Sequence, residues 1–480
     1  MNYYNPTTKH EDLRDFIKIL ETMNDLRIVE NVDPNIEIGI LTAIVGRKKN
    51  HPALLFDKIK GYKDGFRIIT NIITTEQRHM LAAGIDLGKK DVDMVEFLAM
   101  MMQNYKPIKP IDVSDGQVMS NIMKDDRINM NIFPSPLWHE FDGGRYIGTG
   151  TLIIMKDPDT EYVNVATYRV QLHDSKTLGI SISPGHHGDI IRQKYWERGL
   201  SCPVVVSFGH DPTLGVAADL PVPFGESELD YAGWFKGRPV KIVRGPVTEL
   251  PIPADSELVV EGEIPPLDVE SRFEGPFGEF GGYYSFEERP QAVIKVKGVY
   301  FRDNPIIDGR PPYRGVRHDG PLPFNYAILL NTLRKLGHHD VVKIGKAGCF
   351  LVVSLKVRYA GQVRQVADLI MSGIGMRPPK YLVIVDDDID PDNLNDVMWA
   401  IESRVDPEES IYFVKNRWTS LTDPRVPPAK RATGDLTSSS IIIDATRPWS
   451  WRDKFPKPTE PSSHLVQKYY VKWRDLIESC

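Results

Sequence analysis

The sequence has few cysteines and no long apolar run. Cys202, Cys349 and Cys480 lie far apart and form no CxxC pair. Neither a thiolate zinc site nor a disulfide framework is therefore expected, and this usage fits a reducing compartment. No apolar run approaches the ~18 residues of a membrane-spanning helix, and the start, Met1-Asn2-Tyr3-Tyr4, lacks a signal-peptide core. We expect a cytoplasmic protein with no membrane partner.

The sequence also lacks a strong net charge and a nucleotide-binding glycine loop. Its 480 residues include 59 Lys and Arg against 65 Asp and Glu, a net charge of -6. This balance argues against a nucleic-acid partner. No Walker-type loop is present, and no GxGxxG follows an expected strand. Hydrophobic and charged contents of 41% and 26% are ordinary for a globular protein.

The first two parts of the chain differ in their hydrophobic pattern. Leu13, Phe16, Ile17 and Leu20 predict a helix, and the apolar runs 53–56 and 66–73 predict strands. Residues 1–114 therefore indicate a small α/β region. Residues 115–320 show many strand-like runs and few helical ones, beginning with a hairpin over 149–170. We expect a β-barrel or sandwich there.

The last two parts of the chain, residues 321–450 and 451–480, again show helical patterns. Residues 321–450 alternate between helical and strand patterns, which predicts a layered α/β domain with a partly parallel sheet. Residues 451–480 end in an amphipathic helix whose aromatic face should dock on its own chain or on a partner. The predicted fold class is α/β in several domains.

The segment Phe273–Tyr283 carries Glu274 and Glu279, five residues apart, among four glycines and one proline. In extended chain these side chains would point to opposite faces, but the Gly-Pro-Phe-Gly turn can bring both into one pocket. Two neighbouring acids influence each other's pKa, which is a usual way to obtain a proton donor near neutral pH. The alternative is a surface turn with solvated glutamates.

Three further segments hold candidate ligands. Asn164 and Arg169 lie in the hairpin, His186 and His187 lie between glycines, and Glu228 follows a proline-rich turn. Read singly, each is more often a solvated or structural residue. Together, one amide oxygen, one imidazole and one carboxylate make a mixed site for Mg²⁺ or Mn²⁺.

These motifs occur together in a known family. The segments are Asn164–Arg169 (N-x-x-x-x-R), Pro184–His186 (P-G-H), Gly225–Glu228 (G-E-S-E) and Glu274–Glu279 (E-G-P-F-G-E). Their order and spacing resemble the UbiD family of reversible decarboxylases, which use prenylated FMN. The similarity extends to Tyr381–Asp390 and Met398–Ala400 and so spans most of the chain.

The resemblance implies both a fold and a site. An N-terminal α/β region, a split β-barrel that holds the flavin and a C-terminal α/β domain for assembly are expected. Asn164, His186 and Glu228 would bind Mn²⁺, which holds the flavin phosphate, with K⁺ nearby. Arg169, Glu274 and Glu279 would form the catalytic triad, with Glu279 as proton donor. Arg169 would also contact the flavin.

The chain departs from the family before the metal-binding glutamate. Some relatives have serines where this chain has Ala217-Ala218-Asp219, so its phosphate contacts are expected to differ, with Lys380 as a candidate phosphate partner. The basic loop 310–318 includes His318, which could bind a phenolic oxygen. A hydroxylated benzoic acid is the substrate class that the resemblance favours, and an exposed structural loop is the alternative for these residues.

Other functions remain open from the sequence alone. A manganese-dependent hydrolase would use His186, Glu228 and the glutamate pair, although no HxH or HExxH spacing supports it. A non-catalytic flavin-binding subunit and an ordinary FMN oxidoreductase are further alternatives. The resemblance implies that a flavin prenyltransferase supplies the cofactor. A homodimer or homohexamer is expected, with the C-terminal helix crossing between chains.

Overall fold

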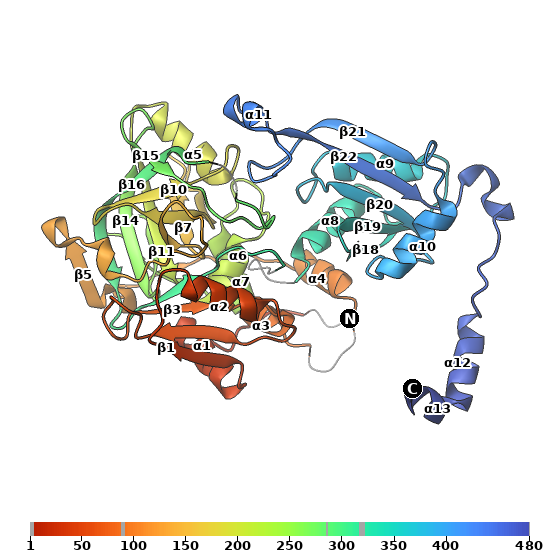
Figure 1. The fold of residues 1–480 in the computed structure, drawn as a ribbon, viewed down its shortest axis with the longest axis horizontal. Helices are drawn as coiled ribbons and strands as arrows, with labels where there is room; N and C mark the ends of the chain where they lie inside the picture. The colour runs from red at the N-terminus through yellow and green to blue at the C-terminus, as the bar shows by residue number, and fades with distance from the viewer. Residues whose placement is uncertain (1–3, 88–91, 285–286, 316–321, 480) are drawn as a thin grey trace. The chain divides into compact units, whose positions relative to one another are not determined.

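The computed structural model describes residues 4–87, 92–284, 287–315 and 322–479. The chain forms two compact units. The first contains Met1–Leu336, Gly373–Pro378 and Lys415–Ser439, and the second contains Gly337–Ser372, Pro379–Val414 and Ser440–Cys480. Both mix helices with sheets, which confirms the predicted α/β class (Figure 1). The four-part division at residues 114, 320 and 450 stays a prediction.

The first unit begins with a small α/β layer. Its elements are α1 (Leu13–Thr22), β1 (Leu26–Glu30), α2 (Glu37–Gly46), β2 (Ala53–Asp57), β3 (Arg67–Thr70), α3 (Glu76–Ala82) and α4 (Met94–Gln103). α1 forms where predicted because Leu13, Phe16 and Leu20 share one buried face, and Asp12 caps its first turn. The sheet has the order β1-β2-β3-β17. Its last strand, β17 (Ile306–Gly309), comes from much later in the chain and lies parallel to β3.

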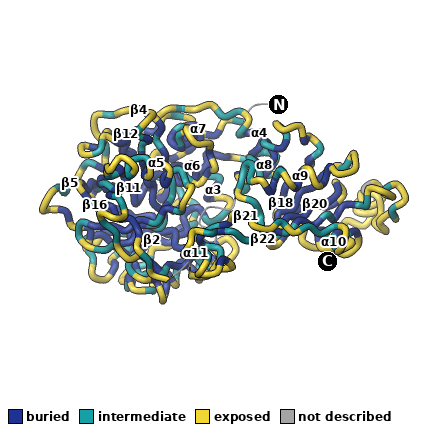
Figure 2. The backbone as a smooth tube through the Cα atoms, turned by 90° about the horizontal axis from the view of Figure 1, so that it is seen from above, coloured by how far each residue is buried: buried dark blue, intermediate teal, exposed yellow. Residues whose placement is uncertain are grey.

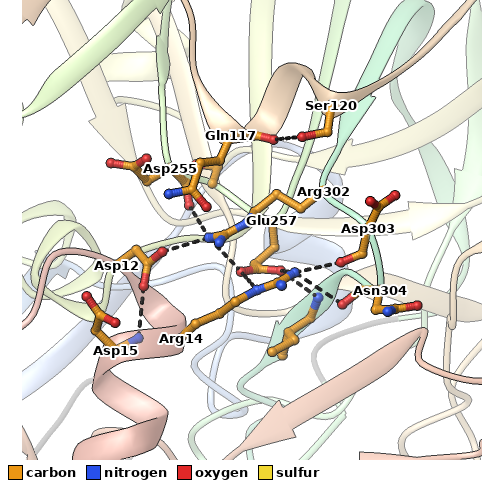
Figure 3. A network of polar contacts seen from close by, with 12 residues as sticks. Asp12, Arg14, Asp15, Gln117, Ser120, Asp255, Glu257, Arg302, Asp303 and Asn304 are labelled. Atoms are coloured by element: carbon orange, nitrogen blue, oxygen red, sulfur yellow. Dashed lines mark hydrogen bonds and ion pairs between the residues drawn. The ribbon is translucent and has the colours of Figure 1, made fainter.

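Ion pairs between charged side chains join the start of α1 to residues much later in the chain (Figure 3). Arg14 donates two hydrogen bonds of 2.8 Å to the fully buried carboxylate of Glu257. Arg302 donates to Asp12 at 2.7 Å and lies 3.2 Å from Glu257. Because loss of either arginine would leave a buried carboxylate short of a cation, this network fixes the position of α1.

A curled, half-barrel sheet of ten strands forms the middle of the first unit. Its order is β6-β9-β10-β16-β14-β11-β7-β8, with β15 and β5 also paired to β16. The strands are β5 (Asn121–Lys124), β6 (Arg145–Gly148), β7 (Leu152–Lys156), β8 (Val163–Ala166), β9 (Arg169–Leu172), β10 (Thr177–Ser181), β11 (Cys202–Gly209), β14 (Leu258–Ile264), β15 (Ser271–Glu274) and β16 (Arg289–Phe301). Nearly all of β11 is buried (Figure 2). This sheet supplies most of the strands that carry the site.

The structure corrects the predicted hairpin. β7 pairs with β8 as expected, but the second arm ends at Ala166. Arg169 begins a separate strand, β9, which pairs with β6 and β10. The chain changes strand neighbours at Thr167 and Tyr168, which a continuous apolar pattern does not reveal. Asn164 and Arg169 therefore lie on two different strands.

Helices in this region are more numerous than predicted. They are α5 (His187–Trp196), α6 (Pro212–Ala218) and α7 (Glu228–Lys236). α6 and α7 are buried on nearly every side, so their sequences lack the amphipathic period that predicts a helix. A three-stranded sheet, β13-β12-β4, completes the region with β4 (Ile111–Asp112), β12 (Lys241–Arg244) and β13 (Pro251–Pro253). α8 (Phe324–Lys335) and α11 (Pro428–Ala432) also belong to the first unit.

The second unit is built on a five-stranded sheet of order β18-β19-β20-β22-β21, and parts of the last two strands, residues 415–418 and 437–439, belong to the first unit. The strands and their covering helices are β18 (Val341–Ala347), β19 (Phe350–Leu355), α9 (Gln362–Met371), β20 (Tyr381–Asp386), α10 (Leu394–Arg404), β21 (Ile411–Trp418) and β22 (Thr437–Ala445). β19, β20 and β22 are parallel, whereas β18 is antiparallel to β19. The predicted partly parallel sheet is confirmed.

The C-terminal helix predicted from the sequence forms as two helices, α12 (Ser463–Lys472) and α13 (Arg474–Ser479). Their large apolar side chains are exposed in the single chain, namely Leu465, Val466, Tyr469, Tyr470, Val471, Trp473, Leu476 and Ile477. Docking of this face therefore stays a prediction. Within the described residues, no helix has the length and apolar character needed to cross a bilayer.

Candidate functional site

The turn after β15 brings the two predicted acids to one arginine. Glu274 ends β15, and the turn that follows returns Glu279 to the same side. Arg169, the first residue of β9, donates to Glu274 through Nε at 2.7 Å and through Nη2 at 3.0 Å. Its Nη1 donates to Glu279 Oε1. The two carboxylates are 1% and 8% exposed, which excludes the alternative of two solvated glutamates.

The electrostatics of the two acids differ. Burial would raise the pKa of Glu274, but the charge and hydrogen bonds of Arg169, with a 2.7 Å bond from the Tyr146 hydroxyl, lower it overall. Burial raises the pKa of Glu279, the charge of Arg169 opposes this, and the nearby Glu274 adds to it. Two neighbouring acids with opposite pKa shifts are suited to different roles, one as a fixed anion and one as a proton carrier.

Phe277 holds the guanidinium from its other side. The Arg169 Cζ lies 5.4 Å from the centre of the Phe277 ring, which is a cation–π distance. Phe277 is 2% exposed and packs 4.2 Å from the Tyr146 ring. The arginine is therefore fixed between two carboxylates and an aromatic face.

A second cluster lies on β8 and α7. Glu228 is the first residue of α7, after the capping residue Ser227. Its carboxylate accepts a 2.7 Å hydrogen bond from the backbone N–H of Val165 and a 3.1 Å bond from Asn164 Nδ2. Asn164 Oδ1 is buried and has no hydrogen-bond partner among the described residues. Buried oxygens normally accept a hydrogen bond, so this oxygen is available to coordinate a metal ion.

His186 completes the set that was predicted to bind a metal. It caps the start of α5, and burial, followed by the positive charge of Arg377, lowers its pKa. A neutral imidazole is the form that binds metal ions. Burial also raises the pKa of Glu228 to about 7. A divalent cation would stabilise this carboxylate as an anion, so the residues present fit such an ion.

All three predicted ligands line one cavity of about 1010 Å³. Residues 166–168, which directly precede Arg169 in the chain, also line it. Among the described residues, no three His, Cys, Asp or Glu side chains gather into a metal-ligating group. The predicted set contains only two residues of those types, with Asn164 as the third ligand.

Several cavity residues were not predicted. Arg377 and Trp418 line the wall, with the Arg377 guanidinium 5.7 Å from the Trp418 ring, and Asn325 lines it as well. All three lie in the first unit. They come from distant parts of the chain, and the only signal in the sequence is a basic residue before Pro378-Pro379. Arg377 supplies a positive charge suited to an anionic group.

The other residues named from the sequence differ in whether they line this cavity. Lys380 precedes β20 in the second unit, and its backbone carbonyl accepts a 3.0 Å hydrogen bond from Ile441 N. His187 also lines the cavity, and its Nδ1 lies 3.0 Å from the Tyr162 hydroxyl. His318 falls outside the described residues. Asp219 lines the cavity and lies 3.5 Å from Arg310.

Three domain models of one family match the chain. They are the N-terminal domain of 3-octaprenyl-4-hydroxybenzoate carboxy-lyase over residues 17–98, its Rift-related domain over 109–313 and its C-terminal domain over 325–445. A phenolic acid decarboxylase of Sedimentibacter hydroxybenzoicus is 31% identical, across 95% of this chain and 94% of its own. The pyrrole-2-carboxylic acid decarboxylase of Pseudomonas aeruginosa is 33% identical, across 82% and 83%.

Solved structures of this family have the same fold. The closed form of a vanillic acid decarboxylase from Sedimentibacter hydroxybenzoicus superposes with a TM-score of 0.84 at 29% identity, over 98% of this chain and 100% of that chain. The UbiD-class enzyme HmfF from Pelotomaculum thermopropionicum, in complex with FMN, gives 0.78 at 26% identity, over 94% and 98%. These matches confirm the resemblance found in the motifs. The chain belongs to the UbiD family of carboxy-lyases.

Proposed function

We propose that this protein is a reversible, non-oxidative decarboxylase of a hydroxylated benzoic acid that uses prenylated FMN. The observation that carries the proposal is the contact of Arg169 with both Glu274 and Glu279. The residues directly before Arg169, 166–168, line a cavity of about 1010 Å³. Relatives named phenolic acid decarboxylases support the substrate class. An evolved dimeric form of HmfF in complex with prFMN supports the cofactor.

The reaction breaks the bond between the ring carbon and the carboxylate, releases carbon dioxide and places a proton on that carbon. The prenylated flavin supplies the electron sink that no side chain offers. Glu279, with its raised pKa, holds the proton and donates it. Glu274 remains an anion that, together with Phe277, fixes Arg169 in place.

We further propose that Asn164, His186 and Glu228 hold Mn²⁺ at the phosphate end of the flavin, with K⁺ nearby. The unpartnered Asn164 Oδ1 and the buried Glu228 carboxylate support this assignment. Arg377 is a further candidate for the phosphate, because it lines the same cavity as Asn164, His186 and Glu228, and Lys380 stays the candidate named from the sequence. Arg169 would also contact the flavin.

We also propose which residues bind the substrate ring. His318 and the neighbouring basic loop are candidates for a phenolic oxygen. The Pseudomonas aeruginosa relative acts, by its name, on a pyrrole carboxylic acid. Both heteroaromatic and phenolic acids therefore belong in a substrate panel.

A flavin prenyltransferase is the proposed cofactor supplier, and a homodimer or homohexamer is the proposed assembly. The exposed apolar face of α12 and α13 supports contacts between copies of the chain.

The test is co-production with a flavin prenyltransferase, followed by the visible spectrum, the intact cofactor mass and assays on a panel of aromatic acids. We expect bound prenylated FMN and carbon dioxide release from at least one phenolic acid. The Glu279→Gln variant should bind the same cofactor and turn over at least about 100-fold more slowly. Colourless protein, despite manganese and an active prenyltransferase, would contradict the proposal and favour a hydrolase. Flavin without any turnover would favour a non-catalytic subunit.

A further inference from the structure

A second charged pair lies behind the turn that carries Glu279. His139 and Asp142 belong to the segment before β6 and are almost fully buried, with side chains 8% and 0% exposed. Asp142 Oδ1 accepts a 3.1 Å hydrogen bond from Gly278 N. Gly143 N donates to the Pro276 carbonyl at 2.8 Å. The segment and the turn are thus joined on both sides of Phe277.

Both ring nitrogens of His139 face hydrogen-bond acceptors. Nδ1 lies 3.0 and 2.9 Å from the two oxygens of Asp142, and Nε2 lies 2.7 Å from the Pro312 carbonyl. A neutral imidazole can donate through only one nitrogen, whereas an imidazolium donates through both. Asp142 also accepts from the backbone N–H groups of His139 and Gly278, so its carboxylate is already an acceptor on every side. The contacts are satisfied only by an imidazolium paired with a carboxylate.

The ring also packs directly on the turn. A Cβ atom added at Gly278 would lie 2.8 Å from the His139 ring, so the glycine allows this close approach. The ring centre is 5.4 Å from that of Phe277, 4.5 Å from that of Tyr313 and 6.2 Å from that of Tyr284. The His139 ring therefore packs against Gly278 and Phe277, while Asp142 accepts a hydrogen bond from the backbone of Gly278.

The charge of His139 reaches Glu279. After burial, Arg169 and Glu274, the positive His139 is a further influence on the pKa of Glu279, and it lowers that pKa. The charged and titratable groups around His139 are Asp142, Tyr284, Tyr313 and Glu279.

We infer that His139 is a positioning residue for the Glu279 turn, held as an imidazolium between Asp142 and the Pro312 carbonyl. It fixes Gly278 and Phe277 and places a second positive charge, besides Arg169, near the Glu279 carboxylate. This role rests on the proposed decarboxylation for its effect on turnover, but the protonation state of His139 can be measured without any activity.

The first test uses long-range ¹H–¹⁵N spectra of histidine-labelled protein, with the His139 signals assigned by their loss in His139→Gln. We expect protons on both ring nitrogens at pH 7, because both nitrogens face acceptors. In Asp142→Asn, which removes the anion that faces Nδ1, we expect the second proton to be lost. A wild-type ring with one bare nitrogen at pH 7 would overturn the inference, whatever the protein catalyses. The His139→Gln variant serves only to assign the signals, and the protonation state itself is measured on the wild-type chain.

The second test is kinetic. In His139→Gln we expect kcat to fall on the order of 10–100-fold, with KM and cofactor content within about twofold, because the proton carrier is misplaced but the cavity is intact. The limb of the pH–rate profile assigned to Glu279 should move to higher pH, since a nearby positive charge is lost.

The matched control is His10→Gln. His10 is also buried and lies 2.9 Å from a carboxylate, Asp211, but outside the site. The His10→Gln variant should leave kcat and the pH profile unchanged even if it lowers thermal stability. An unchanged kcat and pH profile in His139→Gln, or equal effects in both variants, would overturn the positioning role. Absence of decarboxylation in the wild-type protein, with a doubly protonated His139, would instead contradict the proposed function.

Discussion

Val165 donates its backbone N–H to the carboxylate of Glu228 at 2.7 Å, which ties the strand β8 to the first turn of the helix α7. Asn164 donates to the same carboxylate from the adjacent position. Two ligand candidates are thus placed by a backbone contact that does not require the metal. The site is organised before an ion binds, which favours affinity.

Removing the charge of Glu228 should remove the metal. Glu228→Gln keeps an oxygen for Val165 but loses the anion, so Mn²⁺ affinity should fall by about tenfold or more. Metal content by mass spectrometry and flavin absorbance after reconstitution would measure this. Glu226→Gln is the control. Glu226 lies two residues before Glu228, is exposed and accepts a hydrogen bond from the Tyr231 hydroxyl. Equal metal content in the two variants would rule out the assignment of Glu228.

The raised pKa of Glu279 has a consequence for stability. Its carboxyl is more easily ionised in the unfolded chain, whose reference pKa is 4.5, than in the folded one. Ionisation therefore favours unfolding as the pH rises above 4.5 and through the folded pKa. Relative to Glu279→Gln, the wild-type protein should lose Tm over this range. Parallel thermal scans of cofactor-free protein at several pH values would show it, and a difference that is constant or opposite in sign would disprove the shift.

Glu274 should behave in the opposite way. Its folded pKa lies below the reference value of 4.5, so its stabilising contribution is present above that pH and is lost as the pH falls through the folded pKa. Glu274→Gln should therefore cost Tm at neutral pH and converge with the wild type in acid. The same scans test this prediction, and a cost that persists unchanged in acid would contradict it.

The close packing of Gly143 against the turn that carries Glu279 predicts that a larger residue at this position lowers activity. A Cβ at Gly143 would lie 1.8 Å from the Gly275 carbonyl oxygen, so Gly143→Ala must displace the turn that carries Glu279. We expect kcat to fall by about 100-fold with cofactor binding retained.

Gly281→Ala is the control for this variant, because nothing lies within 4 Å of its added Cβ. Similar kcat values for the two alanine variants would show that the turn tolerates the shift.

The apolar face of α12 and α13 should determine assembly. Trp473→Lys places a charge at an exposed aromatic residue of this face and should produce a smaller species in light scattering after size exclusion. Asp475→Asn changes the charge equally in the neighbouring turn and should leave the size unchanged. An unaltered mass for Trp473→Lys would show that these helices do not join copies.

Much of the fold could be predicted from local patterns. α1, β7, β11, β14 and β20 follow from one-sided or continuous apolar runs, which need no knowledge of their neighbours. α6 and α7 could not be predicted, because a helix buried on all sides loses its period. The change of strand neighbours between Ala166 and Arg169 was also hidden, because it depends on which strand lies beside each half.

The candidate site was predictable as a set of residues but not as an arrangement. The Gly-Pro-Phe-Gly turn between Glu274 and Glu279 allows a shared pocket, and the structure brings both acids to Arg169. The hydrogen bond from Tyr146 to Glu274 joins residues far apart in the sequence, and no local pattern signals it. Arg377 was missed for the same reason, since its place in the cavity depends on tertiary packing.

The pairing of β17 with β3 has a consequence for how the chain can be divided. The sheet of the opening region is closed by Ile306–Gly309, so a nascent chain cannot complete it until those residues have been synthesised. A fragment of residues 1–114 would leave the outer edge of β3 with unpaired N–H and C=O groups, which promotes association with other chains. The opening region and the segment that contains β17 therefore have to fold together. A cut between them would separate the sheet from its last strand.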